Sequence, residues 1–170
     1  MSENELNAAA NAEEGVIEDA LLDKYLTFPV GNDIYGIEIR YVTEIVPVLP
    51  ITVVPGVPDF LTGIVNLRGK IIPVIDMHLK FGRPSVEYND RTSIIVLDIE
   101  DISVGIIVDE VEAVIEIKED NIVPPPSFKS SAQTQYIRGV GKVNDEELKL
   151  LLDLETLLNL SDFKDMDEEA

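Results

Sequence analysis

The sequence predicts a mainly all-β fold of two small closed barrels, each with five short strands followed by a short helix. Two observations carry this prediction. Short apolar runs alternate with turn residues along most of the 170-residue chain, a pattern typical of strands. The pattern of the first half then recurs in the second half, which indicates an internal duplication. Turn-rich units of about 65–70 residues cannot leave sheet edges open, and a closed barrel removes those edges.

The residue pattern of the first copy predicts its strands and helix in chain order. The predicted elements are strands at 25–30 and 34–39, a strand or helical turn at 40–46, a short strand at 51–54, a hairpin over 63–76 and a short helix at 77–81. Gly, Asn and Asp at 31–33 favour a turn between the first two strands. Four prolines between Pro47 and Pro58 exclude a regular helix there.

The second copy repeats these elements at a nearly constant spacing. Residues 94–99 match 25–30 at an offset of 69, and the offset rises to 76 and then 77 after insertions in the second copy. The residues that recur are Gly36 and Gly105, Gly63 and Gly139, and Asp76 and Asp153. We interpret them as structural framework: the glycines suit bulges or close backbone contacts, and the aspartates suit helix N-caps rather than catalysis.

The duplication divides the chain into segments. The predicted segments are an acidic, largely disordered extension at 1–23, a first barrel at 24–83, a linker at 84–91, a second barrel with its closing helix at 92–160, and an acidic tail at 161–170. The two terminal segments contain twelve acidic residues and one lysine. Low apolar content with high net charge favours disorder, although residues 16–22 also fit a short docking helix.

The composition excludes several classes of function. A formal net charge of −20 disfavours binding to nucleic acid or to an anionic membrane surface. No apolar run is long enough to span a bilayer, so a cytoplasmic location is predicted. The chain has no cysteine and a single histidine, His78, which makes a metal site or another cofactor improbable. We interpret the acidic clusters at 100–101, 109–112 and 145–147 as solvated, and we find no recognisable catalytic signature.

One position of the hairpin breaks the repeat. The hairpin turns at residues 68–70, which contain Arg68 and Lys70, whereas the second copy carries an asparagine and two acids at 144–146. A residue found in only one copy is free to serve function rather than the fold. Arg68 is a permanent cation in an acidic chain. Its sequence context fits either an exposed ion pair with a nearby acid or a contact with a binding partner.

The residues at 35–39, 42–45, 63–76 and 104–111, including the Asn-Leu-Arg-Gly turn, resemble the CheW family of chemotaxis coupling proteins. The resemblance covers residues 24–160 and points to the stand-alone form of the family. It implies two SH3-like barrels without enzymatic activity. It also implies an adaptor that couples methyl-accepting chemotaxis receptors to the histidine kinase CheA in receptor arrays at the membrane.

The resemblance also implies site residues. The receptor-facing residues would be Arg68, Val42, Glu44, Asn66 and Val111, and a groove between the barrels would take the receptor's helical-hairpin tip. Val42 and Val111 occupy equivalent places in the two copies and are expected to line that groove. Ile37 and Ile45 are the predicted kinase contacts. Two alternatives stay open: a coupling protein of a non-flagellar, twitching-type pathway, and a barrel that binds a small ligand.

Overall fold

The computed structural model describes residues 21–125 and 134–159. The first half contains β1 (Lys24–Val30), β2 (Asp33–Glu38), the 3-10 turn η1 (Ile39–Tyr41), β3 (Val42–Pro47), β4 (Leu61–Leu67), β5 (Lys70–Asp76) and α2 (Met77–Lys80). The second half contains β6 (Ser93–Ile99), β7 (Ile102–Val108), β8 (Ala113–Glu116), η2 (Glu119–Asn121), β9 (Ile122–Val123), η3 (Thr134–Tyr136), β10 (Ile137–Lys142), β11 (Leu148–Leu152) and α3 (Leu154–Leu158). Residues 1–20 and the acidic tail at 161–170 lie outside the described ranges, so their predicted disorder stays a prediction.

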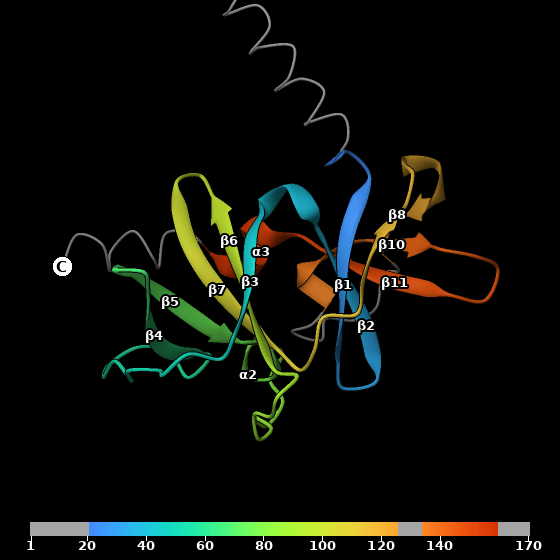
Figure 1. The fold of residues 1–170 in the computed structure, drawn as a ribbon. Coiled ribbons are helices and arrows are strands. Elements are labelled where there is room, and N and C mark those ends of the chain that lie inside the picture. Colours follow the sequence, from blue (N-terminus) through green and yellow to red (C-terminus); the bar gives the residue numbers. More distant parts are fainter. Residues whose placement is uncertain (1–20, 126–133, 160–170) are drawn as a thin grey trace, which may run out of the picture.

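The strands form two sheets that lie side by side (Figure 1), which confirms the mainly β fold of two SH3-like barrels. One sheet has five strands in the order β3-β6-β7-β5-β4. The other has six strands in the order β8-β1-β2-β11-β10-β9, one more than predicted. The additional strand is β8, which is equivalent to the segment at 40–46, where the sequence fits either a strand or a helical turn, while β9 is the counterpart of the predicted strand at 51–54. The predicted strand at 51–54 is reduced to an isolated bridge between Thr52 and Ile64.

Each sheet combines strands from both copies of the repeat. In the six-stranded sheet β1 and β2 come from the first copy, while β8 to β11 come from the second. In the five-stranded sheet the contributions are reversed. Our assignment of one barrel to 24–83 and the other to 92–160 is therefore wrong. The third strand of each copy, β3 or β8, lies in the other sheet from the first two strands of that copy.

The exchanged strands preserve the symmetry of the duplication. Gly36 of β2 lies opposite Leu151 of β11 in a parallel pair. Gly105 of β7 lies opposite Val74 of β5 in the equivalent parallel pair. A Cβ atom added to Gly105 would lie 2.7 Å from a methyl carbon of Ile94. Glycine at this place therefore allows the neighbouring strands to approach, in agreement with its recurrence in the sequence.

A second pair of recurring glycines lies at strand irregularities. The ladder between β4 and β5 shifts register between Leu61 and Gly63, and the ladder between β10 and β11 shifts between Ile137 and Gly139. Gly63 has φ of +157°, and a Cβ atom there would lie 2.2 Å from the carbonyl oxygen of Thr52. Only glycine fits such a backbone contact without displacement of the chain.

The recurring aspartates stand at the N-caps of the two short helices. The Asp76 carboxylate accepts hydrogen bonds from the backbone N–H groups of His78 and Leu79 at the start of α2. The Asp153 carboxylate accepts one from the backbone N–H of Thr156 in α3. Both helices are only about one turn long, so capping satisfies a large share of their free N–H groups.

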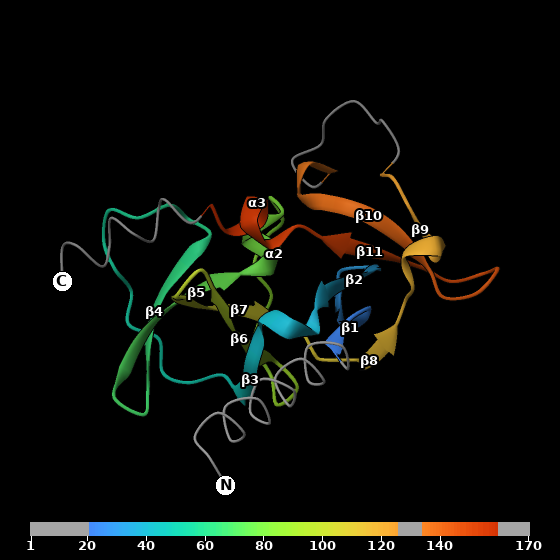
Figure 2. The same ribbon diagram turned by 90° about the horizontal axis from the view of Figure 1, so that it is seen from above.

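The largest apolar cluster joins the two sheets. It combines side chains from the six-stranded sheet, such as Phe28, with side chains from the five-stranded sheet, such as Leu97, and with residues of both helices. Figure 2 shows the helices close to the junction of the sheets. Two smaller clusters each belong to one sheet. Strands such as β6 are buried on both faces, because one face belongs to a barrel interior and the other to the junction.

Candidate functional site

Arg68 and Glu44 form an exposed ion pair at the edges of the five-stranded sheet. The Arg68 guanidinium donates from Nη1 to Glu44 Oε1 at 3.0 Å and from Nη2 to Glu44 Oε2 at 2.8 Å. Glu44 lies on β3 and Arg68 follows β4, the strands at opposite ends of the sheet order. The pair thus links the two edges of this barrel. The hydrogen bonds from Arg68 to Glu44 raise the pKa of the guanidinium, so Arg68 stays charged.

The turn that carries Arg68 is tightly defined. Leu67 pairs with Lys70, which leaves Arg68 and Gly69 as a two-residue loop. Both loop residues have positive φ, 52° and 86°, as a type I′ hairpin turn requires. The Asn66 side chain accepts a hydrogen bond from the Gly69 N–H at 2.9 Å. Asn66 therefore shapes the turn, while the Arg68 side chain, 74% exposed, stays accessible to a partner.

The sequence placed Arg68 and Glu44 on one surface but did not predict that they bind each other. The structure confirms the ion-pair interpretation of Arg68, and its contact with a binding partner stays a prediction. Such an exposed pair contributes little to folding. A bidentate arginine–carboxylate pair nevertheless fixes the orientation of both groups, so it presents a defined arrangement of charge to a partner.

The structure places Val42 and Val111 at the margin of the same apolar cluster. Val42 opens β3 directly after η1, and Val111 lies in the segment between β7 and β8. Both are half-buried and pack against the core that joins the sheets. Val42 directly follows the first crossing of the chain from one sheet to the other, and Val111 lies within the second. Each therefore offers partly accessible apolar surface where the barrels meet.

The two residues predicted to contact the kinase differ in burial. Ile37 is fully buried in the core between the sheets, at 0% exposure, so its assignment as a kinase contact is wrong. The sequence of β2 does not indicate which of its side chains face the core between the sheets. Ile45 is 43% exposed. It lies between the half-buried Glu44 and Val46 on β3, so it points to the outer face of the sheet.

Exposed apolar residues recur at equivalent positions of the two barrels. Ile45 of β3 matches Val114 of β8, and Ile71 of β5 matches Leu148 of β11. All four are large hydrophobic residues with exposed side chains. Isolated exposed apolar residues are ordinary, and the recurrence of these two positions on both barrels follows the internal duplication.

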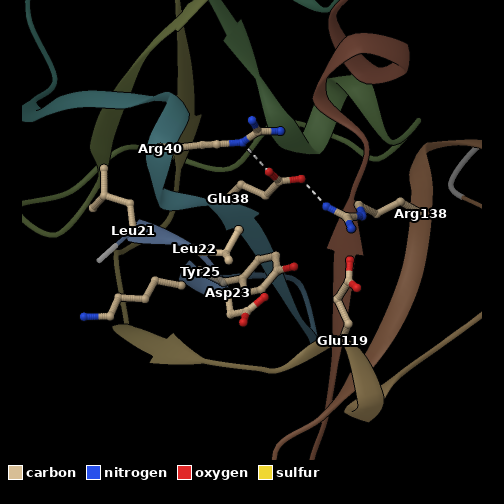
Figure 3. A pocket seen from close by; sticks show the side chains of 9 residues that line it. Leu21, Leu22, Asp23, Tyr25, Glu38, Arg40, Glu119 and Arg138 are labelled. Atoms are coloured by element: carbon tan, nitrogen blue, oxygen red, sulfur yellow. Dashed lines mark hydrogen bonds and ion pairs between the residues drawn. The ribbon is translucent and has the colours of Figure 1, made fainter. Parts of the chain in front are cut away.

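A charged cluster that the sequence analysis did not single out lies beside η1. Glu38 at the end of β2 accepts hydrogen bonds from Arg40 at 2.6 Å and from Arg138 of β10 (Figure 3). Glu38 and Arg138 border two open hollows of about 210 and 240 Å³. Tyr25 lines the first hollow, and burial raises the pKa of its hydroxyl. Both hollows are smaller than typical small-ligand sites, so they give no support to the ligand-binding alternative.

The acidic cluster at 109–112, predicted to be solvated, is paired with bases. The His78 ring lies 2.9 Å from both carboxylate oxygens of Asp109. Within the described ranges, no group of three or more histidine, cysteine or acidic side chains could hold a metal ion. His78 therefore has a carboxylate partner and no set of co-ligands.

Asp76 has a second role besides capping. Its Oδ2 atom accepts hydrogen bonds from the hydroxyl groups of Ser85 at 2.9 Å and Tyr88 at 2.7 Å, both in the predicted linker. Residues 84–91 contain no helix or strand, yet these contacts hold the segment against the five-stranded sheet. Burial and the hydrogen bond to Asp76 raise the pKa of Tyr88 to about 12.

Taken together, these features define a class of protein: a two-barrel module that exposes apolar and charged surfaces. The family model of the CheW-like domain matches residues 24–162. The chain belongs to the CheW-like family of non-catalytic scaffold and coupling proteins, and its function is that of an adaptor in chemotaxis signalling. The resemblance found in the sequence is thereby confirmed.

Individual relatives agree over most of the chain. The chain is 37% identical to the chemotaxis protein CheW of Klebsiella aerogenes, over 86% of its own length and 88% of the relative's. It is 32% identical to CheW of Helicobacter pylori over 88% of each chain. The crystal structure of the scaffolding protein TtCheW from Thermoanaerobacter tengcongensis superposes with a TM-score of 0.72 at 37% identity, covering 79% of this chain and 91% of that one.

Proposed function

We propose that this protein couples chemotaxis receptors to the CheA kinase by binding the helical tip of a receptor where the two barrels meet. The exposed Arg68–Glu44 pair is the observation that carries this proposal. It presents a rigid charged group on a two-residue turn, and Val42, two residues before Glu44, supplies accessible apolar surface beside the junction. A receptor tip is an amphipathic helix pair, recognised by an apolar stripe with flanking charges.

Each receptor-facing residue has a distinct role in this proposal. Val42 and Val111 bury apolar side chains of the receptor. The Arg68 side chain, at 74% exposure, is accessible to a receptor carboxylate while Glu44 keeps it oriented. Asn66 holds the turn in place through Gly69. The charged contact sets the register of the helix more than it adds affinity.

The kinase would bind a different face. Ile45 points outward from β3 with 43% exposure, and its equivalent Val114 is also exposed on the other barrel. An apolar outer edge of this kind fits the barrels of a kinase regulatory domain better than a helix. Separate faces for receptor and kinase would allow one adaptor to hold both at once.

The location of the protein follows from its receptor partner. In the part of the chain that the structure describes, no helix is long and apolar enough to cross a membrane. We propose that the protein reaches membrane-associated receptor arrays by binding receptors and kinase, without insertion into the bilayer.

A charge reversal tests the receptor surface. The Arg68→Glu variant should lose at least about tenfold in affinity for a receptor cytoplasmic fragment, because like charges then face each other at Glu44 and at the receptor. Calorimetric titration measures this affinity, and affinity for a CheA regulatory fragment should stay unchanged.

Lys142→Glu is the matched control, since it makes the same charge change on the equivalent hairpin strand of the other sheet. It should bind receptor like the wild type. A variant that carries both Arg68→Glu and Glu44→Arg restores the internal pair but not the receptor contact, so its affinity should stay low. Unchanged receptor affinity in Arg68→Glu would contradict the proposed surface.

A further inference from the structure

Three ion pairs frame the second crossing between the sheets. The crossing runs from Asp109, directly after β7, to Glu112, directly before β8. Its three acids each have a base from a different part of the fold: Asp109 with His78, Glu110 with Arg91, and Glu112 with Lys149. Val111 is the only apolar residue among these four, and every other residue of the crossing has a charged partner.

The pairs differ in burial, and two of them reach the protein interior. The His78 side chain is 8% exposed and the Lys149 side chain 10%, whereas Arg91 is 79% exposed. A hydrogen bond in a dry environment restricts geometry more strongly than one at the surface. The His78–Asp109 hydrogen bond therefore constrains the first end of the crossing. The ion pairs of Lys149 at 3.6 Å and Arg91 at 3.8 Å are longer than hydrogen bonds and add less.

His78 is well placed to act as a fixed point. Its backbone N–H donates to Asp76 at 2.9 Å, and its carbonyl oxygen accepts from the Arg83 N–H at 2.8 Å. Its Nε2 lies 2.9 Å from each Asp109 oxygen. Because a carboxylate only accepts hydrogen bonds, Nε2 carries the proton. The imidazole is thus held by its own backbone and donates to the first residue of the crossing.

The far end of the crossing is held by the six-stranded sheet. The Glu112 N–H donates to the carbonyl oxygen of Thr27 at 2.8 Å, and the Thr27 hydroxyl donates to the carbonyl oxygen of Ala113 at 3.1 Å. Only Glu110 and Val111 lie between these contacts and Asp109. A shift of Asp109 would therefore move Val111 directly.

The first crossing is built differently. It is the 3-10 turn η1, where Arg40 binds Glu38 and Tyr41. In the alignment of the two copies, Arg40 takes the place of Asp109 and Glu155 takes the place of His78. The first crossing thus has an arginine where the second has an aspartate, and a glutamate where the second has a histidine, so the histidine–aspartate contact occurs only at the crossing that carries Val111. By the same argument that singled out Arg68, such a feature is free to serve function.

We propose that His78 is a positioning residue: its hydrogen bond to Asp109 fixes one end of the second crossing, the backbone hydrogen bond from Glu112 to Thr27 fixes the other, and Val111 between them is thereby held in place for the receptor. This inference rests on the proposed function, because the proposed function identifies the receptor as the partner that Val111 contacts. The positioning itself is a property of the chain alone, and it can be measured without a receptor.

The test compares variants of the full chain in titrations with a receptor cytoplasmic fragment. His78→Leu removes the donor, and Asp109→Ala removes the acceptor from a partly exposed side chain that tolerates truncation. Each should weaken binding about five- to tenfold, the effect of one hydrogen bond. The double variant should be no weaker than either single one, because both remove the same interaction. CheA-fragment affinity should stay unchanged.

Conservative and surface variants separate positioning from general damage. His78→Gln keeps an N–H donor at a similar reach and should bind within about twofold of wild type. Arg91→Ala removes the exposed pair of the same crossing and should also stay within about twofold. Failure of His78→Gln to restore binding would overturn the hydrogen-bond role of His78.

Amide hydrogen exchange gives a readout that needs no receptor. The amides of residues 110–112 should exchange about tenfold faster in His78→Leu and Asp109→Ala, while those of β10 keep wild-type rates. Wild-type exchange at 110–112 would overturn the positioning role, whatever the receptor titration shows. A second outcome would be that His78→Leu and Asp109→Ala bind the receptor normally while Arg68→Glu loses binding. It would overturn the link between His78 and Val111 and leave the proposed receptor surface intact. Normal binding by Arg68→Glu would instead count against the receptor surface.

Discussion

Gly63 links the backbone packing of the barrel to the turn that carries Arg68. It lies at the register shift of β4, where the backbone of Thr52 passes so close that no side chain fits. The same strand ends in the turn that carries Arg68. A side chain at Gly63 would displace β4 or the segment around Thr52, so its effect would extend to the charged turn.

Gly63→Ala should therefore destabilise the protein by on the order of 3 kcal/mol, since the new Cβ collides with backbone and the φ angle is unfavourable. Urea unfolding followed by circular dichroism measures this. Gly56→Ala is the control: Gly56 also has positive φ, +80°, but nothing lies within 4 Å of the added Cβ. It should cost only about 1 kcal/mol. Equal losses in the two variants would rule out the backbone contact as the cause.

At the scale of elements, the predicted linker is part of the folded structure. It has no regular secondary structure, yet Ser85 and Tyr88 donate hydrogen bonds to the buried Asp76 that caps α2. The second copy has an equivalent cap, but Asp153 is bound there by Thr156 of its own helix. Asp76 and Asp153 thus both cap a helix, and only Asp76 also binds a segment distant in the chain.

The Tyr88 contact predicts a loss of stability at alkaline pH. The pKa of Tyr88 is raised from 10.0 to about 12 in the folded protein. A raised pKa means that the folded state holds the proton more tightly, so this stabilisation is fully present below pH 10 and disappears as pH rises to 12. Tyr88→Phe should be less stable than wild type at pH 7 and show a smaller decline between pH 10 and 12. Urea unfolding at several pH values checks both.

Thr156→Val provides the matched control, because it removes a hydroxyl group from the equivalent cap at an exposed site. Its unfolding free energy should differ little from wild type at pH 7 and should decline with the wild-type slope at alkaline pH. If Tyr88→Phe and Thr156→Val behaved alike, the linker contact would not carry the alkaline effect.

At the scale of the whole molecule, the exchange of strands makes the two barrels inseparable. Four ladders connect the two halves of the chain: β1 with β8, β2 with β11, β3 with β6, and β5 with β7. The largest apolar cluster also draws on both halves. The orientation of one barrel to the other is therefore fixed by backbone hydrogen bonds as well as by packing. A rigid junction suits an adaptor that holds two partners in a set geometry.

Cutting the linker should leave the molecule assembled. A protease site placed between Val86 and Glu87, both exposed, would separate the halves covalently after folding. The two fragments should elute together in gel filtration, because the connecting ladders and the central core remain, and they should separate in denaturant. If each half formed a barrel alone, the two fragments would separate under native conditions. Such a separation would therefore contradict the exchange of strands between the halves.

The sequence alone determined the first two strands of each copy, the hairpin, the duplication, the caps and the family, because these depend on residue patterns over a few positions. Only the tertiary structure decided which copy supplies each strand, since two copies with the same pattern satisfy the same hydrogen bonds whether their strands are exchanged or not. It also decided that Ile37 is buried, that Arg68 meets Glu44, and that His78 meets Asp109. Those contacts join residues far apart in the chain, and no local pattern encodes them.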